Sequence, residues 1–442
     1  MKFKKILFTL IFLPSFLFAQ HTIKATFSPA KDFKWAILYK NTPTGNKYIV
    51  QGKIENGSLS FTLDPSTTKG IYKLVYAAPQ SEYNFDIIYN TEEDVELTFN
   101  ANEGAVFQKS SENILLNNYL NEFIEIGKKI ETSYSQSNID KNAIVKLYHQ
   151  QSETQKNYEE TSNGKLVNHF IKANKPYIPK EYESPTIYIE NLSKNYFKNI
   201  DFSDPVLQSS SFLIEKSLAY ILGIIPKEGD KFTAYNDNID IVSDLIKSTS
   251  ASFQKSFLDK LWQKLVTYKL NNTANYLAER HLIPLATQFN DNALVLKLTQ
   301  FKNLSIGNVA PNFTWETFEN GNTETHQLKD LAVAENYILV FWSSACSHCL
   351  KKIPLLKEFV QTLDSSKYKV IAIGLKDGPE KWEKEIEKYP EFINVIKLKK
   401  WDNSVVTNYG LTSTPTYFVL DRDKKFTAKP ENLEDLIEFI KN

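Results

Sequence analysis

Residues 337–349 read Tyr-Ile-Leu-Val-Phe-Trp-Ser-Ser-Ala-Cys-Ser-His-Cys and contain the only two cysteines of this 442-residue chain, Cys346 and Cys349. The first six residues form a short apolar run, as in a β-strand that is buried on both faces. Beyond the cysteines, apolar side chains recur at helical spacing, at Leu350, Ile353, Leu356, Val360 and Leu363. The cysteine pair is therefore predicted to lie where a buried strand gives way to a helix.

This position favours thiol chemistry. Cys346 would lie near the first helical turn, where unpaired backbone N–H groups and the helix dipole favour a thiolate. Cys349 lies one turn further along and can reach the Cys346 sulfur. The C-x-x-C pair thus predicts thiol–disulfide exchange, in which Cys346 attacks a substrate disulfide and Cys349 resolves the mixed disulfide. Apart from this redox-active disulfide, we expect no cofactor.

Three other uses of the pair are open. A structural disulfide that closes a four-residue loop would constrain the unfolded chain little. A structural zinc site needs four ligands, whereas only His348 and His326 are available nearby in the sequence. A copper site with cysteine and histidine ligands is compatible with the spacing. We favour exchange chemistry over these alternatives and expect no bound metal.

Composition narrows the class of protein. Lysine and arginine together number 52, as do aspartate and glutamate, so the formal net charge is zero. No half of the chain stands out as a basic surface, and we expect no nucleic-acid partner. The hydrophobic content of 42% is sufficient for packed cores, and the length suggests about two to four domains.

The N-terminus has the pattern of a secretory signal peptide. Lys2, Lys4 and Lys5 precede an apolar run that extends from Ile6 to Ala19, and Ala19 is a plausible last residue before cleavage. The run is too short to span a bilayer comfortably, and no later stretch predicts an integral membrane span. With residues 1–19 as the signal peptide, we expect an exported, soluble, periplasmic or extracytoplasmic protein in a compartment where disulfides form.

The rest of the chain divides into three predicted domains. Residues 20–104 contain short aromatic or alternating runs between turn signals, which predict a small all-β sandwich or barrel. Residues 105–300 have helical periodicity and predict an all-α domain. Residues 301–442 alternate strands with helices and predict an α/β sheet with at least one parallel crossover.

Individual elements follow from the same patterns. The β-domain strands are expected at residues 35–39, 48–54, 58–63, 71–76, 85–89 and 95–99. One helical face is expected to contain Phe257, Leu258, Leu261, Leu265 and Tyr268. The third domain is expected to have a hairpin at Asn320-Gly321, strands at 370–375 and 417–420, a turn at 421–424 and a last helix around 433–440. His149, His169 and His281 are isolated in sequence and are expected to be ordinary histidines rather than metal ligands.

The third domain resembles the thioredoxin superfamily and, within it, the TlpA-like thiol-disulfide oxidoreductases. The matching features are Gly307-Asn308-Val309-Ala310-Pro311-Asn312-Phe313, Phe341-Trp342, the cysteine motif, Pro354, Thr414-Pro415 and the Asp421 turn. The resemblance covers about the last third of the chain. The two preceding domains resemble the amino-terminal extensions of some members by order and pattern.

The resemblance assigns roles to single residues. It implies that Cys346 is the nucleophile and Cys349 the resolving thiol. It also implies a cis-proline at Pro415, with the backbone of Thr414 facing the cysteines and pairing with a substrate chain. Trp342 is expected beside the active site, although it could equally be an ordinary core aromatic residue.

Two positions depart from the family. Many thioredoxins have a buried aspartate where this chain has Val340, and several TlpA-like reductases have a glutamate where it has Lys352. No general base is therefore assigned for Cys349. Water or a carboxylate from elsewhere in the chain must serve.

The residues between the cysteines bear on the redox direction. His348 can carry positive charge and donate hydrogen bonds toward a Cys346 thiolate, and Ser347-His348 therefore favours a potential above that of a strong reductant. Lys351 and Lys352 act in the same direction. We expect a potential between about −270 and −120 mV.

The function expected from the sequence is dithiol–disulfide exchange on exported proteins. The enzyme would reduce or reshuffle their disulfides and would be kept reduced by a thiol–disulfide electron donor in the membrane. A disulfide-forming oxidase is an alternative within the same class. A peroxiredoxin-like thiol peroxidase would need Pro and Thr where the chain has Leu339 and Ser343. The third alternative is a scaffold or binding module with a redox-switchable site.

Overall fold

The computed structural model describes residues 21–225, 229–319, 322–375, 380–397 and 403–442. The predicted signal peptide and the Asn320-Gly321 turn lie outside these residues. The chain divides into two compact units, residues 1–264 and 265–442, and each is considered by itself. The three-domain boundaries stay a prediction within this coarser division.

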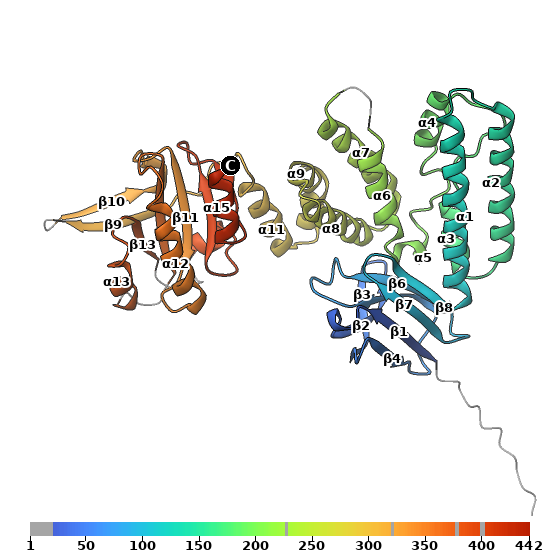
Figure 1. Ribbon diagram of the computed structural model, residues 1–442, viewed down its shortest axis with the longest axis horizontal. Helices are drawn as coiled ribbons and strands as arrows, with labels where there is room; N and C mark the ends of the chain where they lie inside the picture. The colour runs from blue at the N-terminus through green and yellow to red at the C-terminus, as the bar shows by residue number, and fades with distance from the viewer. Residues whose placement is uncertain (1–20, 226–228, 320–321, 376–379, 398–402) are drawn as a thin grey trace, which may run out of the picture. The chain divides into compact units, whose positions relative to one another are not determined.

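The first unit begins with two four-stranded sheets (Figure 1). One sheet has the order β4-β1-β7-β8 and the other β3-β2-β5-β6. The strands are β1 (Thr22–Ser28), β2 (Trp35–Thr42), β3 (Gly45–Lys53), β4 (Ser58–Thr62), β5 (Gly70–Val75), β6 (Asn84–Tyr89), β7 (Val95–Asn100) and β8 (Gly104–Lys109), with a 3₁₀ turn at Ala30–Asp32. Residues from both sheets form one apolar core, which includes Ile23, Phe27, Leu38, Leu74 and Phe99. The predicted β-domain is therefore a sandwich.

Helices follow the sandwich in the first unit. They are α1 (Ser111–Tyr134), α2 (Lys141–Thr161), α3 (Val167–Asn174), α4 (Pro185–Lys194), α5 (Pro205–Gln208), α6 (Phe212–Gly223), α7 (Lys231–Leu245), the 3₁₀ turn Ile246–Ser248 and α8 (Ala251–Thr267), in which the division between the units falls. The apolar face predicted for α8 is buried at Phe257, Leu258, Leu261 and Leu265, but Tyr268 is 52% exposed, so the prediction that it lies on this face is wrong. Tyr268 follows the last residue of α8, so the helical spacing no longer applies to it.

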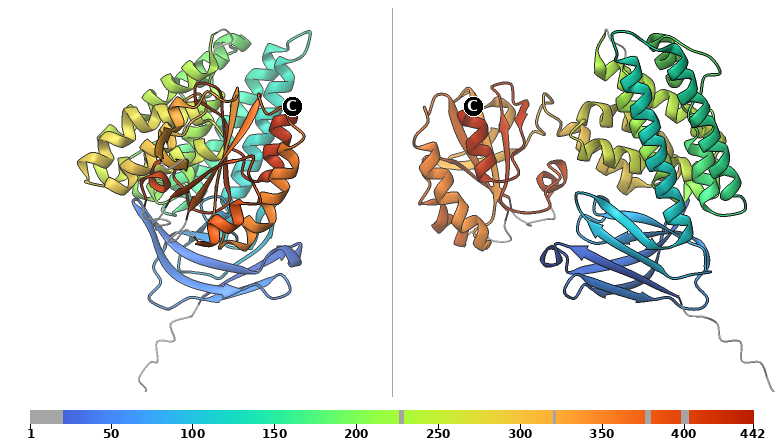
Figure 2. Two further views of the ribbon diagram at one scale, coloured as in Figure 1. Left: turned by 90° about the vertical axis from the view of Figure 1, so that its left-hand side faces the viewer. Right: turned by 45° about the vertical axis from the view of Figure 1, so that its right-hand side comes forward.

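The second unit begins with helices and ends with a five-stranded sheet (Figure 2). Its helices are α9 (Asn271–Leu277), a π-helical turn (Ala278–Leu282), α10 (Ile283–Gln288), α11 (Asn292–Asn303), α12 (Ser347–Val360), α13 (Glu380–Ile386), α14 (Ser404–Asn408) and α15 (Leu433–Lys441). Its strands are β9 (Thr314–Glu319), β10 (Asn322–Gln327), β11 (Asn336–Trp342), β12 (Tyr368–Leu375), β13 (Ile393–Lys397), β14 (Thr416–Leu420) and β15 (Phe426–Ala428), with a 3₁₀ turn at Leu328–Asp330.

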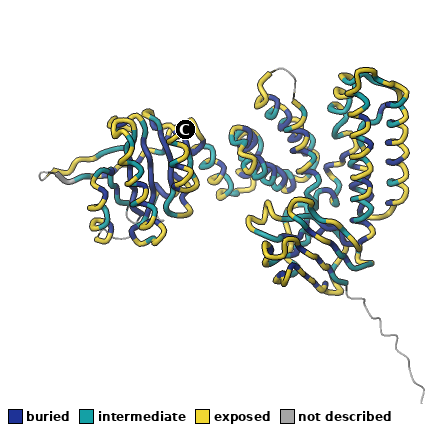
Figure 3. Tube along the Cα trace, viewed as in Figure 1, coloured by how far each residue is buried: buried dark blue, intermediate teal, exposed yellow. Residues whose placement is uncertain are grey.

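The five-stranded sheet has the order β13-β12-β11-β14-β15. Strands β12 and β13 run parallel to β11, whereas β14 runs antiparallel to it. Each residue of β11 after Asn336 is buried, because both faces of this central strand are covered (Figure 3). The apolar run of residues 337–342 is therefore part of this strand.

The two faces of the sheet have separate cores. One face packs against α12 and α15 and includes Val340, Trp342, Cys349 and Tyr417. The other packs against the region of α14 and includes Leu339, Phe341 and Tyr409. Because side chains alternate along a strand, successive residues of β11 enter opposite cores. Among the described residues, no helix is long and apolar enough to cross a membrane.

Candidate active site

The dithiol lies at the start of α12. Cys346 is the N-cap residue, with extended backbone angles (φ −93°, ψ 114°), and the Cys349 amide donates a hydrogen bond to the Cys346 Sγ atom over 3.4 Å. The sulfur thus takes the place that a serine or aspartate oxygen usually occupies at a helix N-cap. Negative charge is stabilised there by the helix dipole. The site therefore favours a Cys346 thiolate, as the sequence predicted.

The two thiols are free, and their surroundings differ. Partial burial raises the pKa of Cys346, but hydrogen bonds from Cys349, from the Thr414 side chain and from the His348 backbone outweigh it, and the net pKa is below the ordinary value for a cysteine. Cys349 is completely buried, and this burial raises its pKa to about 11. Cys346 is therefore the more accessible and more acidic of the two thiols, and Cys349 is the buried and less acidic one.

The loop before β14 faces the dithiol. The Thr414–Pro415 peptide bond is cis. The Thr414 carbonyl oxygen lies 3.6 Å from the Cys346 Sγ atom and accepts a hydrogen bond from the thiol. The structure thus brings together residues that are 68 positions apart in the sequence.

These features decide the family of the second unit. A mixed five-stranded sheet carries a C-x-x-C pair at the start of the helix after its central strand, and the Thr414 carbonyl of the facing loop lies beside the first cysteine. The last third of the chain is a thioredoxin-like domain. The resemblance deduced from the sequence motifs is thereby confirmed for this region.

A family match and several solved structures relate to this part of the chain. Residues 306–429 match the model of the AhpC/TSA family. No curated protein matches the chain. A thioredoxin-like protein from Bacteroides caccae is 20% identical, covering 60% of this chain and 96% of its own, with a TM-score of 0.40.

Two further solved structures are similar to the thioredoxin-like domain. The thioredoxin domain of a thiol-disulfide oxidoreductase from Bacteroides vulgatus is 24% identical and covers 31% of this chain and 96% of its own, with a TM-score of 0.27. A thiol:disulfide interchange protein from a Bacteroides species is 24% identical and covers 31% of this chain and 90% of its own, also with a TM-score of 0.27.

The family's opening motif extends the sheet of the thioredoxin-like domain. The Gly307 amide donates to the Phe426 carbonyl, and the Ala310 amide donates to the Lys424 carbonyl. The Pro311 carbonyl accepts a hydrogen bond from the buried Tyr409 hydroxyl over 2.7 Å. Residues 307–311 thus lie along the edge formed by β15.

The remaining predicted site residues lie around the dithiol. Ser347 and His348 are exposed in the first turn of α12. Trp342 ends β11 and is fully buried in the same core as Cys349, with its ring edge-on to Tyr389 at a centroid distance of 6.1 Å. Trp342 is therefore a core residue that also borders the active site.

The two departures from the family pattern have structural counterparts. Val340 is buried and apolar, so no carboxylate lies at that position. Lys352 forms an ion pair with Glu434, which comes from the first turn of α15. A carboxylate does reach this side of the domain, but from a helix 82 residues further along the chain. Sequence reasoning missed Glu434 because nothing local links α15 to α12.

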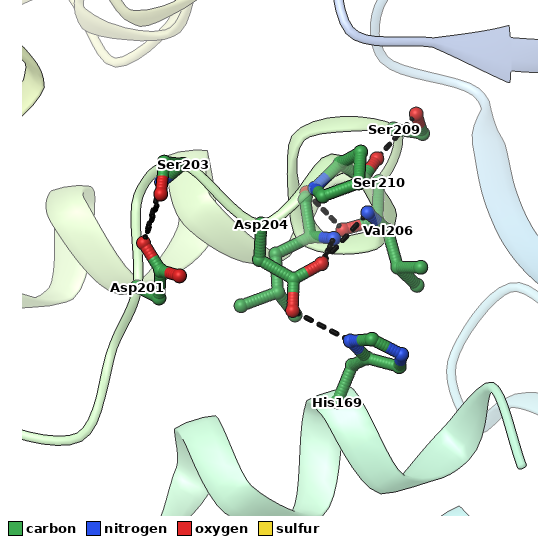
Figure 4. A network of polar contacts seen from close by, with 9 residues as sticks. His169, Asp201, Ser203, Asp204, Val206, Ser209 and Ser210 are labelled. Atoms are coloured by element: carbon green, nitrogen blue, oxygen red, sulfur yellow. Dashed lines mark hydrogen bonds and ion pairs between the residues drawn. The ribbon is translucent and has the colours of Figure 1, made fainter. Parts of the chain in front are cut away.

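The isolated histidine His169 is far from this site in sequence and belongs to the first unit. Its Nδ1 atom lies 2.5 Å from the Asp204 carboxylate, whose other oxygen accepts hydrogen bonds from the Val206 and Leu207 amides (Figure 4). The pair ties α3 to the start of α5. Among the described residues, no group of three or more histidine, cysteine or acidic side chains could hold a metal ion.

Proposed function

We propose that this protein is an exported thiol-disulfide oxidoreductase that reduces or reshuffles disulfides of other exported proteins. The observation that carries the proposal is the asymmetry of the dithiol: a partly exposed Cys346 with a lowered pKa lies next to a buried Cys349 whose pKa is raised to about 11. Export rests on the signal-peptide pattern of residues 1–19.

The proposed reaction has two exchange steps. The Cys346 thiolate attacks one sulfur of the substrate disulfide, which forms a mixed disulfide and releases the first substrate thiolate. The Cys349 sulfur, as thiolate, then attacks the Cys346 sulfur, which releases the second substrate thiol and leaves the Cys346–Cys349 disulfide. The substrate gains two electrons and two protons, and the enzyme loses them. A thiol–disulfide donor in the membrane would return both to the enzyme.

Reduction of insulin tests the proposal. The reduced protein should reduce insulin disulfides, and Cys346→Ser should abolish this activity because no second nucleophile is accessible. Cys349→Ser should instead accumulate mixed disulfides on Cys346, and these would identify the substrates in exporting cells. Undiminished insulin reduction by Cys346→Ser would refute the proposed exchange, whereas an inactive wild-type protein would favour a scaffold or binding module.

The redox state in cells separates reductase from oxidase. Trapping by alkylation should find Cys346 and Cys349 mostly reduced if the protein works as a reductase or isomerase. A mostly oxidised pair would assign the protein to disulfide formation instead.

A thiol peroxidase is the second candidate, because residues 306–429 match the AhpC/TSA family. Such an enzyme would use Cys346 alone for the attack on peroxide. Peroxide consumption that persists in Cys349→Ser would therefore favour this function over disulfide exchange.

A further inference from the structure

Tyr417 lies in β14, two residues after the cis-proline and directly opposite Val340 of β11 in the antiparallel register. Its side chain is 1% exposed. The hydroxyl oxygen is completely buried and has no hydrogen-bond partner among the described residues. A buried hydroxyl without a partner is unfavourable, since it has lost its hydrogen bonds to water. A functional role would explain why a tyrosine, with this unpartnered hydroxyl, occupies the position.

The surroundings of Tyr417 indicate such a role. Tyr417, Val340 and Cys349 belong to the same buried core, on the face of the sheet that α12 covers. Burial raises the pKa of Tyr417 far above its ordinary value, and the nearby Cys349 and Glu434 raise it further. The hydroxyl therefore keeps its proton and can act only as a neutral donor or acceptor.

We propose that Tyr417 is a positioning residue for the resolving step, whose hydroxyl donates a hydrogen bond to the Cys349 thiolate as that thiolate forms. This inference rests on the proposed exchange function. Many thioredoxins have a buried aspartate at the position of Val340. Tyr417 lies opposite Val340 and would act in the same region of the core. The aspartate takes up a proton, whereas the tyrosine stabilises the charge that remains on sulfur.

The step balances without an additional reactant. Cys349 loses its proton to the released substrate thiolate, and its sulfur then bonds to the Cys346 sulfur as the bond from Cys346 to the substrate breaks. Tyr417 keeps its own proton throughout. Its contribution is to increase the fraction of Cys349 that is thiolate at a given pH.

Few other titratable groups face Cys349. Helix α12 contributes Cys346 itself and the more exposed His348 and Lys352, and α15 contributes Glu434, which is paired with Lys352. The β11 residues of this core, Ile338, Val340 and Trp342, and the buried β12 residues, Val370 and Ala372, carry no titratable group, whereas Tyr368 at the start of β12 is titratable and packs against the same core. Tyr389 lies further along the core beyond Trp342, and its hydroxyl donates to Glu385 over 3.4 Å.

The test separates the two exchange steps in the full chain. Reduced protein is mixed with glutathione disulfide and quenched with acid, and the mixed disulfide and the internal disulfide are followed by mass spectrometry across a pH series. In Tyr417→Phe, formation of the mixed disulfide should be unchanged. Its resolution should slow by roughly ten- to a hundred-fold below the Cys349 pKa, as expected for loss of a hydrogen bond to a charged group. The pH midpoint of resolution should rise correspondingly.

Tyr409→Phe is the matched control. It also removes a buried tyrosine hydroxyl from this domain, but in the core on the opposite face of the sheet, where the hydroxyl bonds to Pro311. Its resolution rate should follow the wild-type pH profile. Thermal unfolding of Tyr417→Phe should show no loss of stability, because the hydroxyl that it removes has no partner.

Three outcomes would overturn the inference: a wild-type pH profile of resolution in Tyr417→Phe, an equal slowing of both exchange steps, or an equal slowing in Tyr409→Phe. If Tyr417→Phe cannot be obtained folded, Tyr417→Leu serves in the same comparison. A wild-type protein that forms neither the mixed disulfide nor the internal disulfide would instead refute the proposed exchange function.

Discussion

The Cys349 amide donates a hydrogen bond to the Cys346 sulfur over 3.4 Å, and this one contact links the two thiols of the active site through the first turn of α12. It stabilises negative charge on Cys346, while Cys349 itself is fully buried. The same helical turn thus makes one cysteine more acidic and keeps the other protonated. This difference leads to the first prediction.

Alkylation of the native, reduced protein near neutral pH should be confined to Cys346. Its pKa is lowered, so more of it is thiolate at this pH than of an ordinary cysteine, and its reaction rate should rise with pH at a lower midpoint than in the denatured protein. Cys349, with a pKa of about 11, should be only about one-thousandth thiolate at pH 8. Peptide mass spectrometry after timed iodoacetamide treatment measures both rates. Denatured protein, in which both cysteines should react alike, is the control, and equal labelling in the native state would contradict the prediction.

His348→Ala should make the disulfide more reducing. The substitution removes a side chain that can place positive charge near the Cys346 thiolate, so the reduced form loses stabilisation. Because His348 is exposed, the potential should fall by only roughly 10–20 mV. Equilibration with glutathione buffers measures it, and Ser347→Ala serves as the control at the neighbouring exposed position. A shift to a more positive value would show that His348 does not act through charge. A wild-type potential below about −270 mV would contradict the intermediate value that we expect.

Gly374→Ala should destabilise the thioredoxin-like domain. A Cβ atom at this position in β12 would lie 1.9 Å from Nε1 of Trp382, so the indole of α13 would have to move. Overpacking of this kind costs about 1–3 kcal/mol. Thermal or urea unfolding of this domain, monitored by the hydrogen exchange of β11 and β12 amides, measures the loss of stability.

Gly127→Ala is the comparison, and it should change the stability in the opposite direction. Gly127 lies inside α1, where an added Cβ atom would meet nothing within 4 Å. Alanine should therefore stabilise the helix by about 0.5–1 kcal/mol. Unchanged stability in Gly374→Ala would show that Trp382 can rearrange without cost.

Helices α9–α11 should unfold together with the thioredoxin-like domain. The Asn275 amide donates to Ser305 Oγ over 2.8 Å, and the Gln300 amide donates to the Thr407 carbonyl over 2.6 Å. A fragment of residues 269–442 should therefore melt in one transition, and a fragment of residues 305–442 should melt roughly 4 °C or more below it. Gln300→Glu in the longer fragment isolates the second contact, because glutamate cannot donate to the carbonyl. Equal melting temperatures of the two fragments would place these helices outside the cooperative unit.

The strands that were predicted from the sequence and those that were not differ in length and in how fully they are buried. The run 337–342 is apolar at every position because β11 is covered on both faces, and this leaves a strong local signal. Strand β15 has three residues, and β13 has only one fully buried side chain, so neither has a distinctive pattern. Strand β1 does alternate, with Ile23, Ala25 and Phe27 buried, and this signal was overlooked.

The candidate site likewise has some features that the sequence predicts and others that it does not. The spacing of Cys346 and Cys349, their place between a strand and a helix, and the resemblance that assigns Pro415 were all available from the sequence. The sequence also showed that Val340 and Lys352 leave the family's usual proton acceptors absent. These features are local, because they depend on residues within a few positions of one another.

Only the tertiary structure decided which groups surround the dithiol. It placed the Thr414 carbonyl at Cys346, paired Glu434 with Lys352, and set Tyr417 opposite Val340. It also gave the two cysteines opposite pKa shifts. These relationships depend on strand register, helix packing and burial, which join segments tens of residues apart and leave no periodic signal in the sequence. The sequence by itself thus determined the thioredoxin-like domain and the position of its dithiol, on which the proposed exchange chemistry rests, whereas the tertiary structure decided the surroundings and the pKa shift of each thiol.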